Sequence, residues 1–334
     1  MSATETVLQR PRVDTVPAIE WPTLALIALA YGGWLTLTWN FAALPAWVVT
    51  PCLAVLLTLH SSVQHEILHG HPTRWAFTNR MLGIVPLSLW IPYDRFRHLH
   101  LIHHVNERLT DPLDDPEANY VLPADWERRS PLLRGIFEAQ LTLAGRMLIG
   151  SWWRMGRFIL GEARACLRNE PGVRAAWLMH LVLCVPVVYW VSVVCGIPLW
   201  FYVVAIVIPG NAILLVRSYA EHRARAATPE RTAIVENSWV LGPLFLFNNL
   251  HALHHAEPGL PWYRYNARYR VLRERLVAEN AGLVYQTYFD VARRYLFRMH
   301  DQAPHPLGRA PGNCVRDADG RTLAVAAADQ AGYG

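Results

Sequence analysis

Four stretches of the chain are nearly free of charge and form long apolar segments. They cover about residues 22–41, 46–64, 175–196 and 198–216. A helix needs about 20 apolar residues to span the hydrocarbon core of a bilayer, so each stretch predicts a membrane-spanning helix. The link within the first pair and the link within the second pair are both very short, which predicts two antiparallel helical hairpins.

Other segments mix apolar residues with arginine. Residues 81–92 are apolar but too short to cross a bilayer, which favours a re-entrant or interfacial segment. Residues 132–167 have the pattern of amphipathic helices lying on a membrane, and residues 267–299 the pattern of one amphipathic helix. The expected fold is therefore an all-α integral membrane protein, with four transmembrane helices in two hairpins and a cytoplasmic helical cap.

Three regions are expected along the chain. Residues 1–20 are polar and predict a short flexible arm, and residues 21–300 predict a single membrane domain. Residues 301–334 are rich in Gly, Ala and Asp, which predicts a disordered tail.

The composition supports a membrane protein and gives it an orientation. Hydrophobic residues make up 53% of the chain and charged residues 17%, and all 31 basic residues are arginines. A net charge of +5 in a soluble protein would suggest nucleic acid. Here the arginines avoid both tight links, as the positive-inside rule predicts for cytoplasmic segments. We therefore expect no nucleic-acid partner, and a bacterial inner (cell) membrane location with both termini and the cap in the cytoplasm.

Histidines are concentrated in three clusters on the predicted cytoplasmic side. The chain has 15 histidines. Clustered with H-x-x-x-H or H-x-x-H-H spacing are His65 and His69, then His100, His103 and His104, then His251, His254 and His255. Residues three or four apart share a helix face, whereas adjacent residues diverge by about 100°. Adjacent histidines therefore suit two neighbouring metal ions better than one.

With His222, which follows the fourth apolar stretch, nine histidines become candidate metal ligands. A shell of imidazoles that is poor in oxygen fits iron, zinc or copper better than magnesium or calcium. Zinc would suit hydrolysis and iron would suit O₂ activation, and the spacing alone does not separate them. A metal-handling membrane protein is a remote alternative, because the four predicted spans have no Asp, Glu or Arg in their cores.

The three clusters and their flanks resemble the integral-membrane fatty acid desaturase and hydroxylase superfamily. The chain has HEILH at 65–69, HLIHH at 100–104 and HALHH at 251–255. The stretch NNLHALHHAEPGLPWY at 248–263 is similar to the third histidine box of the bacterial fatty acid desaturase branch. The Ala220-Glu221-His222 stretch resembles the additional ligand of that branch.

This resemblance implies a non-haem di-iron oxidoreductase with the nine histidines as catalytic iron ligands. The cofactors would be two iron ions, with O₂ as co-substrate. The expected activity is desaturation of a membrane lipid or fatty acyl chain, and the alternative is hydroxylation or ketolation of an alkyl, terpenoid or carotenoid substrate. Because no electron-transfer domain is apparent in the chain, electrons would come from a separate donor such as a ferredoxin and its reductase.

Several polar residues beside the clusters could support the ligands. Asp111, Asp115, Glu66 and Glu221 are either acceptors that orient imidazoles or ordinary loop and helix residues. Asn248 or Asn249 could hold a water on iron. Outside the nine ligands, two histidines lie beside a cluster, His71 and His98, and four are expected to be structural, His60, His180, His300 and His305.

Overall fold

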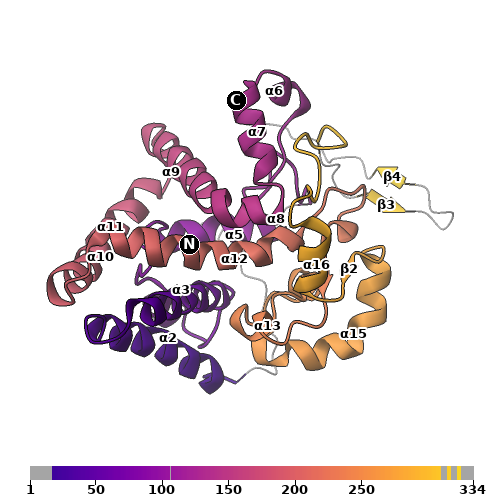
Figure 1. The fold of residues 1–334 in the computed structure, drawn as a ribbon. Helices are drawn as coiled ribbons and strands as arrows, with labels where there is room; N and C mark the ends of the chain where they lie inside the picture. The colour runs from indigo at the N-terminus through magenta and orange to yellow at the C-terminus, as the bar shows by residue number, and fades with distance from the viewer. Residues whose placement is uncertain (1–16, 106, 310–313, 317–321, 325–334) are drawn as a thin grey trace.

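The computed structural model describes residues 17–105, 107–309, 314–316 and 322–324, which are mostly helical (Figure 1). The predicted flexible arm therefore lies almost entirely outside the described residues, and so does most of the predicted disordered tail. The described residues 301–309 pack against the loop after helix α5 (Tyr93–Val105), where Val121 donates its N–H to the carbonyl of Ala303.

Long apolar helices form where the sequence predicts the spans. In chain order they are α2 (Trp21–Trp39), α3 (Ala46–Leu68), α10 (Val173–Tyr189) with the π-helix η2 (Trp190–Val194), and α11 (Leu199–Phe201) with the π-helix η3 (Tyr202–Val207) and α12 (Ile208–Glu221). Three continuous helices are long and apolar enough to cross a membrane: Ala46–Leu68, Val173–Val194 and Leu199–Glu221. Helix α2 is not among them, so the arrangement of four spans in two hairpins stays a prediction.

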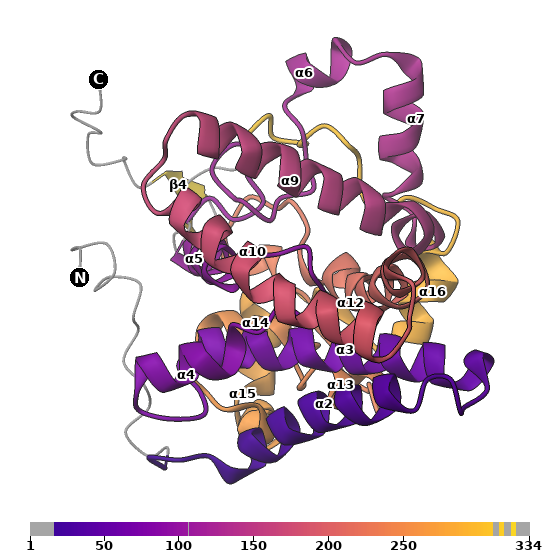
Figure 2. The ribbon, with the colours of Figure 1, turned by 90° about the vertical axis from the view of Figure 1, so that its left-hand side faces the viewer.

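Helix α3 is central to the apolar helices, since both α2 and α12 pack along it (Figure 2). The approach of α12 is close at Gly210, where a Cβ atom would lie 2.8 Å from the carbonyl oxygen of Ala54. The hydroxyl of Thr58 lies 2.9 Å from the carbonyl oxygen of Gly210. A small residue and an interhelical hydrogen bond are the usual means by which membrane helices approach closely.

Polar side chains among the apolar helices are hydrogen-bonded to one another. The indole N–H of Trp34 donates to the hydroxyl of Tyr202 at 2.8 Å, and that hydroxyl donates to the carbonyl of Leu87 at 2.7 Å. In an apolar surrounding such groups are costly unless they are paired. These bonds fix α2 against η3 and against the loop before α5.

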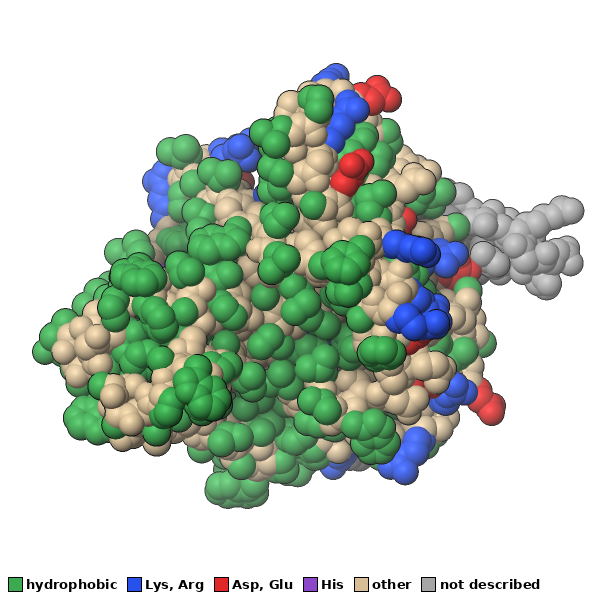
Figure 3. Space-filling model, viewed as in Figure 1, with side chains coloured by type: hydrophobic (Ala, Val, Ile, Leu, Met, Phe, Trp, Pro, Cys, Tyr) green, Lys and Arg blue, Asp and Glu red, His purple; other side chains and the backbone are tan. Residues whose placement is uncertain are grey.

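The outer surface of these helices is apolar. Figure 3 shows hydrophobic side chains covering the part of this face formed by α2 and α10–α12, with arginines around α15 and α16 and also around α6, α7 and α9. Exposed large side chains on α10 include Leu178, Leu181, Val182 and Val185. Apolar patches of this extent mark contact with lipid or protein, and the surface agrees with a membrane location.

Other helices and strands separate and follow the long apolar helices in the chain, and their arrangement as the predicted cytoplasmic cap stays a prediction. The helices, in chain order, are α4 (Ala76–Gly83), α5, α6 (Pro123–Glu127), α7 (Pro131–Ala139), α8 (Leu143–Gly145), η1 (Arg146–Gly150), α9 (Ser151–Leu167), η4 (Pro229–Arg231), α13 (Leu241–Leu244), α14 (His251–Ala256), η5 (Trp262–Arg264), α15 (Tyr265–Glu279) and α16 (Tyr288–Tyr295). The strands are β1 (Ile234–Val235), which pairs in parallel with β2 (Val284–Tyr285), and β3 (Cys314–Arg316), which pairs antiparallel with β4 (Thr322–Ala324).

The prediction of one amphipathic helix over residues 267–299 is wrong. Helix α15 ends at Glu279, and Ala281 and Gly282 both take positive φ angles, which end a right-handed helix. The chain then pairs with β1, and α16 begins after Thr287, whose side chain accepts the N–H of Asp290. The prediction failed because apolar residues keep a helix-like spacing on both sides of this turn, so their pattern does not reveal it.

Candidate metal centre

The nine candidate histidines lie on or just after four helices, and seven of them are at a C-terminal end. His65 and His69 are at the end of α3, and His222 is the residue after α12. The last turn of α5 carries His103 and His104, and that of α14 carries His254 and His255. His100 lies earlier on α5, and His251 is the first residue of α14. The C-terminal end of a helix carries partial negative charge, so this arrangement favours a cation where the four ends meet.

The nine histidines divide into two groups. We call them the five-histidine group, with His65, His69, His100, His104 and His254, and the four-histidine group, with His103, His222, His251 and His255. Within each group, one ring nitrogen of every member lies within 4.8 Å of those of the others. Adjacent residues go to different groups in both H-x-x-H-H clusters, as the 100° divergence on a helix requires.

The Nε2 atoms face one another in pairs at nearly constant spacing. In the five-histidine group, His100 Nε2 lies 3.2 Å from that of His69 and 3.0 Å from that of His104. In the four-histidine group, His222 Nε2 lies 3.1 Å from that of His103 and 3.0 Å from that of His251. Nitrogens bound to one ion at about 2.1 Å and at right angles would be about 3 Å apart. The residues therefore fit a metal ion in each group.

Other buried ring nitrogens in the groups have no hydrogen bond within the described part of the chain. The Nε2 atoms of His65, His254 and His255 have no hydrogen-bond partner among the described residues. A buried polar atom without a partner is costly. A metal ion bound by these lone pairs would remove that cost.

Carboxylates hold two of the imidazoles from behind. Glu117 lies 2.7 Å from His100 Nδ1, and Asp115 lies 2.8 Å from His103 Nδ1. A carboxylate accepts, so in both rings Nδ1 carries the proton and Nε2 presents its lone pair to the group. Asp115 is one of the acceptors predicted from the sequence. Glu117, two residues later, was not predicted, although it ends an acidic stretch that begins at Asp111.

Neutral groups hold three further imidazoles. The Oδ1 atom of Asn248 lies 3.0 Å from His251 Nδ1, and the hydroxyl of Tyr265 lies 2.9 Å from His254 Nδ1. The carbonyl of Arg231 accepts from His222 Nδ1 at 3.3 Å. Asn248 thus orients the ligand His251, and its Oδ1 atom is directed at that ring and not at a metal position. Tyr265 gave no signal in the sequence, because it lies beyond the third cluster at no recognisable ligand spacing.

Most of these imidazoles are neutral near pH 7. Burial and neighbouring histidines lower the pKa of His104, His251 and His254 well below the usual value. Burial also lowers the pKa of His103, but Asp115 and Glu117 outweigh it and raise the pKa to about 9. Neutral imidazole is the form that binds metal. At His103 the carboxylates favour a positive charge, which a metal ion can supply in place of the proton.

The remaining polar candidates have other neighbours, although Glu221 also lies beside one of the nine histidines. His71 joins a separate buried cluster with Glu20 and Glu66, and His98 is exposed on α5. Glu221 lies 2.8 Å from Arg217 and 3.4 Å from His251 Nδ1. Asp111 accepts backbone N–H groups within its loop and pairs with Arg309, and Asn249 donates to the carbonyl of Val235.

Besides His71, four buried histidines of the described residues are outside both groups and have oxygen atoms as neighbours. His60 lies beside the Tyr31 hydroxyl, His180 beside the Leu89 carbonyl, His300 beside the Tyr285 hydroxyl and His305 beside the Thr110 hydroxyl. Each lies within 3.4 Å of such an oxygen. They therefore have structural partners of the ordinary kind.

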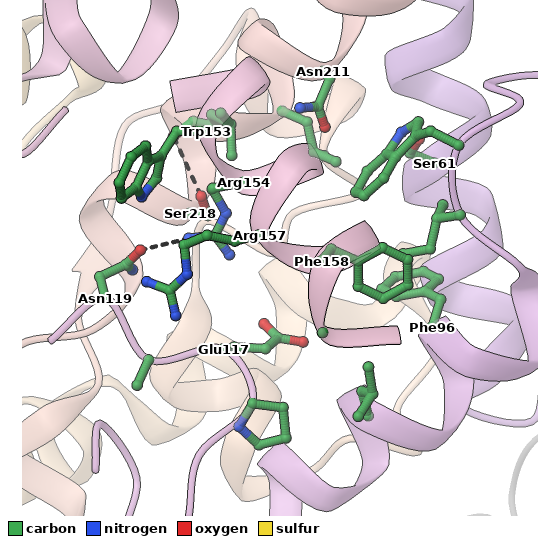
Figure 4. Close-up of a pocket in the computed structure, with 18 of the residues that line it drawn as sticks. Ser61, Phe96, Glu117, Asn119, Trp153, Arg154, Arg157, Phe158, Asn211 and Ser218 are labelled. Atoms are coloured by element: carbon green, nitrogen blue, oxygen red, sulfur yellow. Dashed lines mark hydrogen bonds between the residues drawn. The ribbon is translucent and has the colours of Figure 1, made fainter. Parts of the chain in front are cut away.

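A cavity of about 350 Å³ adjoins the five-histidine group. Its lining includes His65 and also Glu117, the carboxylate that holds His100. In Figure 4, Glu117, Arg154 and Arg157 approach the cavity from one side and Phe96 and Phe158 from the other. A concave site with apolar walls and a few polar groups is the usual form of a ligand pocket.

Comparison with known families agrees with this geometry. The family model for fatty acid desaturases matches residues 42–289, which include all three histidine clusters and His222. A search of curated proteins found no similar sequence. Family membership makes the chain a membrane oxidoreductase that acts on lipid-like chains, with a centre that is typically di-iron. The chain belongs to the fatty acid desaturase family.

Proposed function

We propose that this protein is a di-iron enzyme that desaturates a lipid acyl chain with O₂ and electrons from a separate donor. The observation that carries the proposal is the position of the cavity. It is lined both by His65, a member of the five-histidine group, and by apolar side chains suited to an alkyl chain. A substrate carbon in the cavity would then be next to one of the metal positions.

The nine histidines would hold the two iron ions, five at one position and four at the other. When bound, the iron supplies the O₂ activation needed to remove hydrogen from an unactivated C–H bond. The overall reaction takes two hydrogens from the chain, together with O₂, two electrons and two protons, and releases two waters. Since the electrons must be delivered, we propose an external donor such as a ferredoxin with its reductase.

The protein's own side chains bind and orient. Trp90, Phe96 and Phe158 line the cavity and would hold the alkyl chain while excluding water. Glu117 and Asp115 keep the Nδ1 protons on His100 and His103, so that each ring presents Nε2 in a fixed direction. Fixed ligands reduce the reorganisation that the reaction requires.

We place the enzyme in a bacterial inner membrane with its centre on the cytoplasmic side. The support is the distribution of arginine and the position of the histidines at the ends of the apolar helices. A soluble reduced donor would reach the centre from that side.

Lipid analysis of an expression host tests the proposal. Cells producing the protein should gain chains with two fewer hydrogens, only with O₂ present, and cells producing the His254→Ala variant should not. Chains that gain one oxygen would assign hydroxylation or ketolation in place of desaturation. No change in any lipid, with zinc bound to the purified protein, would favour a metal-handling role and contradict the proposal.

A further inference from the structure

One end of the cavity carries positive charge that lacks a carboxylate partner. Arg154 and Arg157, both on α9, line the cavity. Arg154 donates to Asn119 Oδ1, and the buried Arg146 donates to the same oxygen at 3.1 Å. Among the described residues, none of these three arginines has a carboxylate within 4.0 Å. Two guanidinium groups thus share one neutral amide, and a third, that of Arg157, lines the same cavity.

The carboxylates near the cavity already have partners. Glu162 forms two hydrogen bonds with Arg95, at 2.7 and 2.9 Å. Glu117 holds His100, and Glu221 pairs with Arg217. Glu117, Glu221 and Asp115 attract Arg154 from beyond 4.0 Å, but burial outweighs them and lowers the pKa of its guanidinium. At Arg157, burial, Arg154 and Arg129 all lower the pKa, so this end of the cavity keeps positive charge. Burial and the neighbouring Arg154 lower the pKa of Arg146 to about 9, the direction expected for a cation short of counter-charge.

Three side chains that line the same cavity have a buried polar atom with no hydrogen-bond partner in the described part of the chain. The atoms are Gln140 Oε1, Trp153 Nε1 and Asn211 Nδ2. Gln140 is 1% exposed, and Asn211 is a polar residue within the apolar helix α12. Trp153 and Asn211 have hydrogens to donate, as do the arginines, whereas the Gln140 oxygen accepts and would need a donor. Groups of this kind in an otherwise apolar cavity provide a place for a polar, acceptor-rich part of a ligand.

We infer that Arg154 and Arg157 form a subsite for the anionic headgroup of an amphiphilic substrate, whose alkyl chain extends toward His65. The inference rests on the proposed function and narrows its substrate class. It selects chains that end in carboxylate or phosphate oxygens over alkanes, terpenoids and carotenoids without such a group. Guanidinium groups suit both kinds of anion because they bind two oxygens at once.

Equilibrium binding of three ligands with the same chain length tests the subsite. The metal-loaded protein in nanodiscs of neutral phosphatidylcholine is titrated with tritiated palmitate, hexadecyl phosphate and hexadecanol, with empty nanodiscs subtracted. At least one anion should bind about tenfold more tightly than the alcohol, the ratio expected for hydrogen bonds to a charged group. The tighter of the two anions identifies the headgroup as a carboxylate or as a phosphate.

Matched variants on one helix separate the subsite from a general effect of charge. The double variant Arg154→Gln with Arg157→Gln should bring the preference close to one, and Arg157→Lys should retain part of it. Arg164→Gln removes an exposed arginine of α9 that does not line the cavity, and it should leave the preference unchanged. A preference that survives in the double variant, or that disappears equally in Arg164→Gln, overturns the inference.

The binding test is independent of the test of function. Equal binding of all three ligands, or binding of none, overturns the subsite even if desaturation is observed. A clear anion preference in a protein that forms no lipid product would instead retain the subsite and contradict the proposed activity.

Discussion

The five-histidine and four-histidine groups differ in what surrounds them. His65 of the five-histidine group lines the cavity, and so does Glu117, which holds His100. None of the four residues of the other group is among the described residues that line it. The four-histidine group instead has Asp115 behind His103 and Glu221 beside His251. We therefore expect two metal positions of unequal role, with the five-histidine position nearer the substrate.

The largest effects should come from the adjacent residues His254 and His255, which belong to different groups. Replacing either by Ala should abolish product formation, because both metal positions are needed. Each variant should lose about one metal ion per chain and keep the other, which metal analysis of the purified proteins measures. His98→Ala is the control, since His98 is exposed beside the second cluster and outside both groups. If both single variants retain two ions, the division into groups is wrong.

A smaller effect is expected from the carboxylates behind the ligands. Glu117→Gln should act on the five-histidine position and Asp115→Asn on the four-histidine position, through His100 and His103. Loss of such a partner lowers metal affinity or activity by about 10- to 100-fold. Competition with a metal chelator measures the affinity of each position. Asp114→Asn, in the same loop but paired with arginines, is the control, and an equal loss in it would contradict a specific role.

Neutral partners should contribute less than carboxylates. Tyr265→Phe removes the hydroxyl next to His254 Nδ1 but keeps the ring. A neutral hydrogen bond contributes about 1 kcal/mol, so metal affinity at the five-histidine position should fall by about fivefold. The same chelator titration shows this change. A loss as large as that in Glu117→Gln would mean that Tyr265 does more than orient His254.

The smallest effect on the metal positions is expected from a histidine outside both groups. His300 is buried beside the Tyr285 hydroxyl, and His300→Gln should lower the free energy of unfolding by about 1–2 kcal/mol. Metal content and activity per folded chain should not change. Thermal unfolding in detergent measures the first quantity and metal analysis the second. Loss of metal in this variant would show that His300 contributes to a metal position after all.

Patterns of consecutive residues in the sequence predicted much of the fold. Three apolar stretches became helices long enough to span, because hydropathy is a property of consecutive residues. The break after Glu279 was missed because apolar spacing continues through the Ala281-Gly282 turn, although Gly282 was a visible signal. Pairing of β2 with β1 depends on residues about 50 positions apart, which periodicity does not reveal.

The site likewise has features that the sequence predicts and features that depend on how distant segments pack. The separation of His103 from His104 follows from helix geometry alone, and the structure reproduces it. Which clusters share a group depends on how α3, α5 and α14 approach, so the partnership of His65 with His254 was not predictable. Glu117 reaches His100 through a loop, and Tyr265 reaches His254 from the next helix, so neither has a fixed spacing from its ligand.

Metal content of the purified protein tests the central claim most directly. The protein is produced with iron supplied, solubilised in detergent and analysed for iron, zinc and copper. We expect about two irons per chain, one for each histidine group. Two zinc ions and no iron, despite the iron supplied, would contradict an O₂-activating centre.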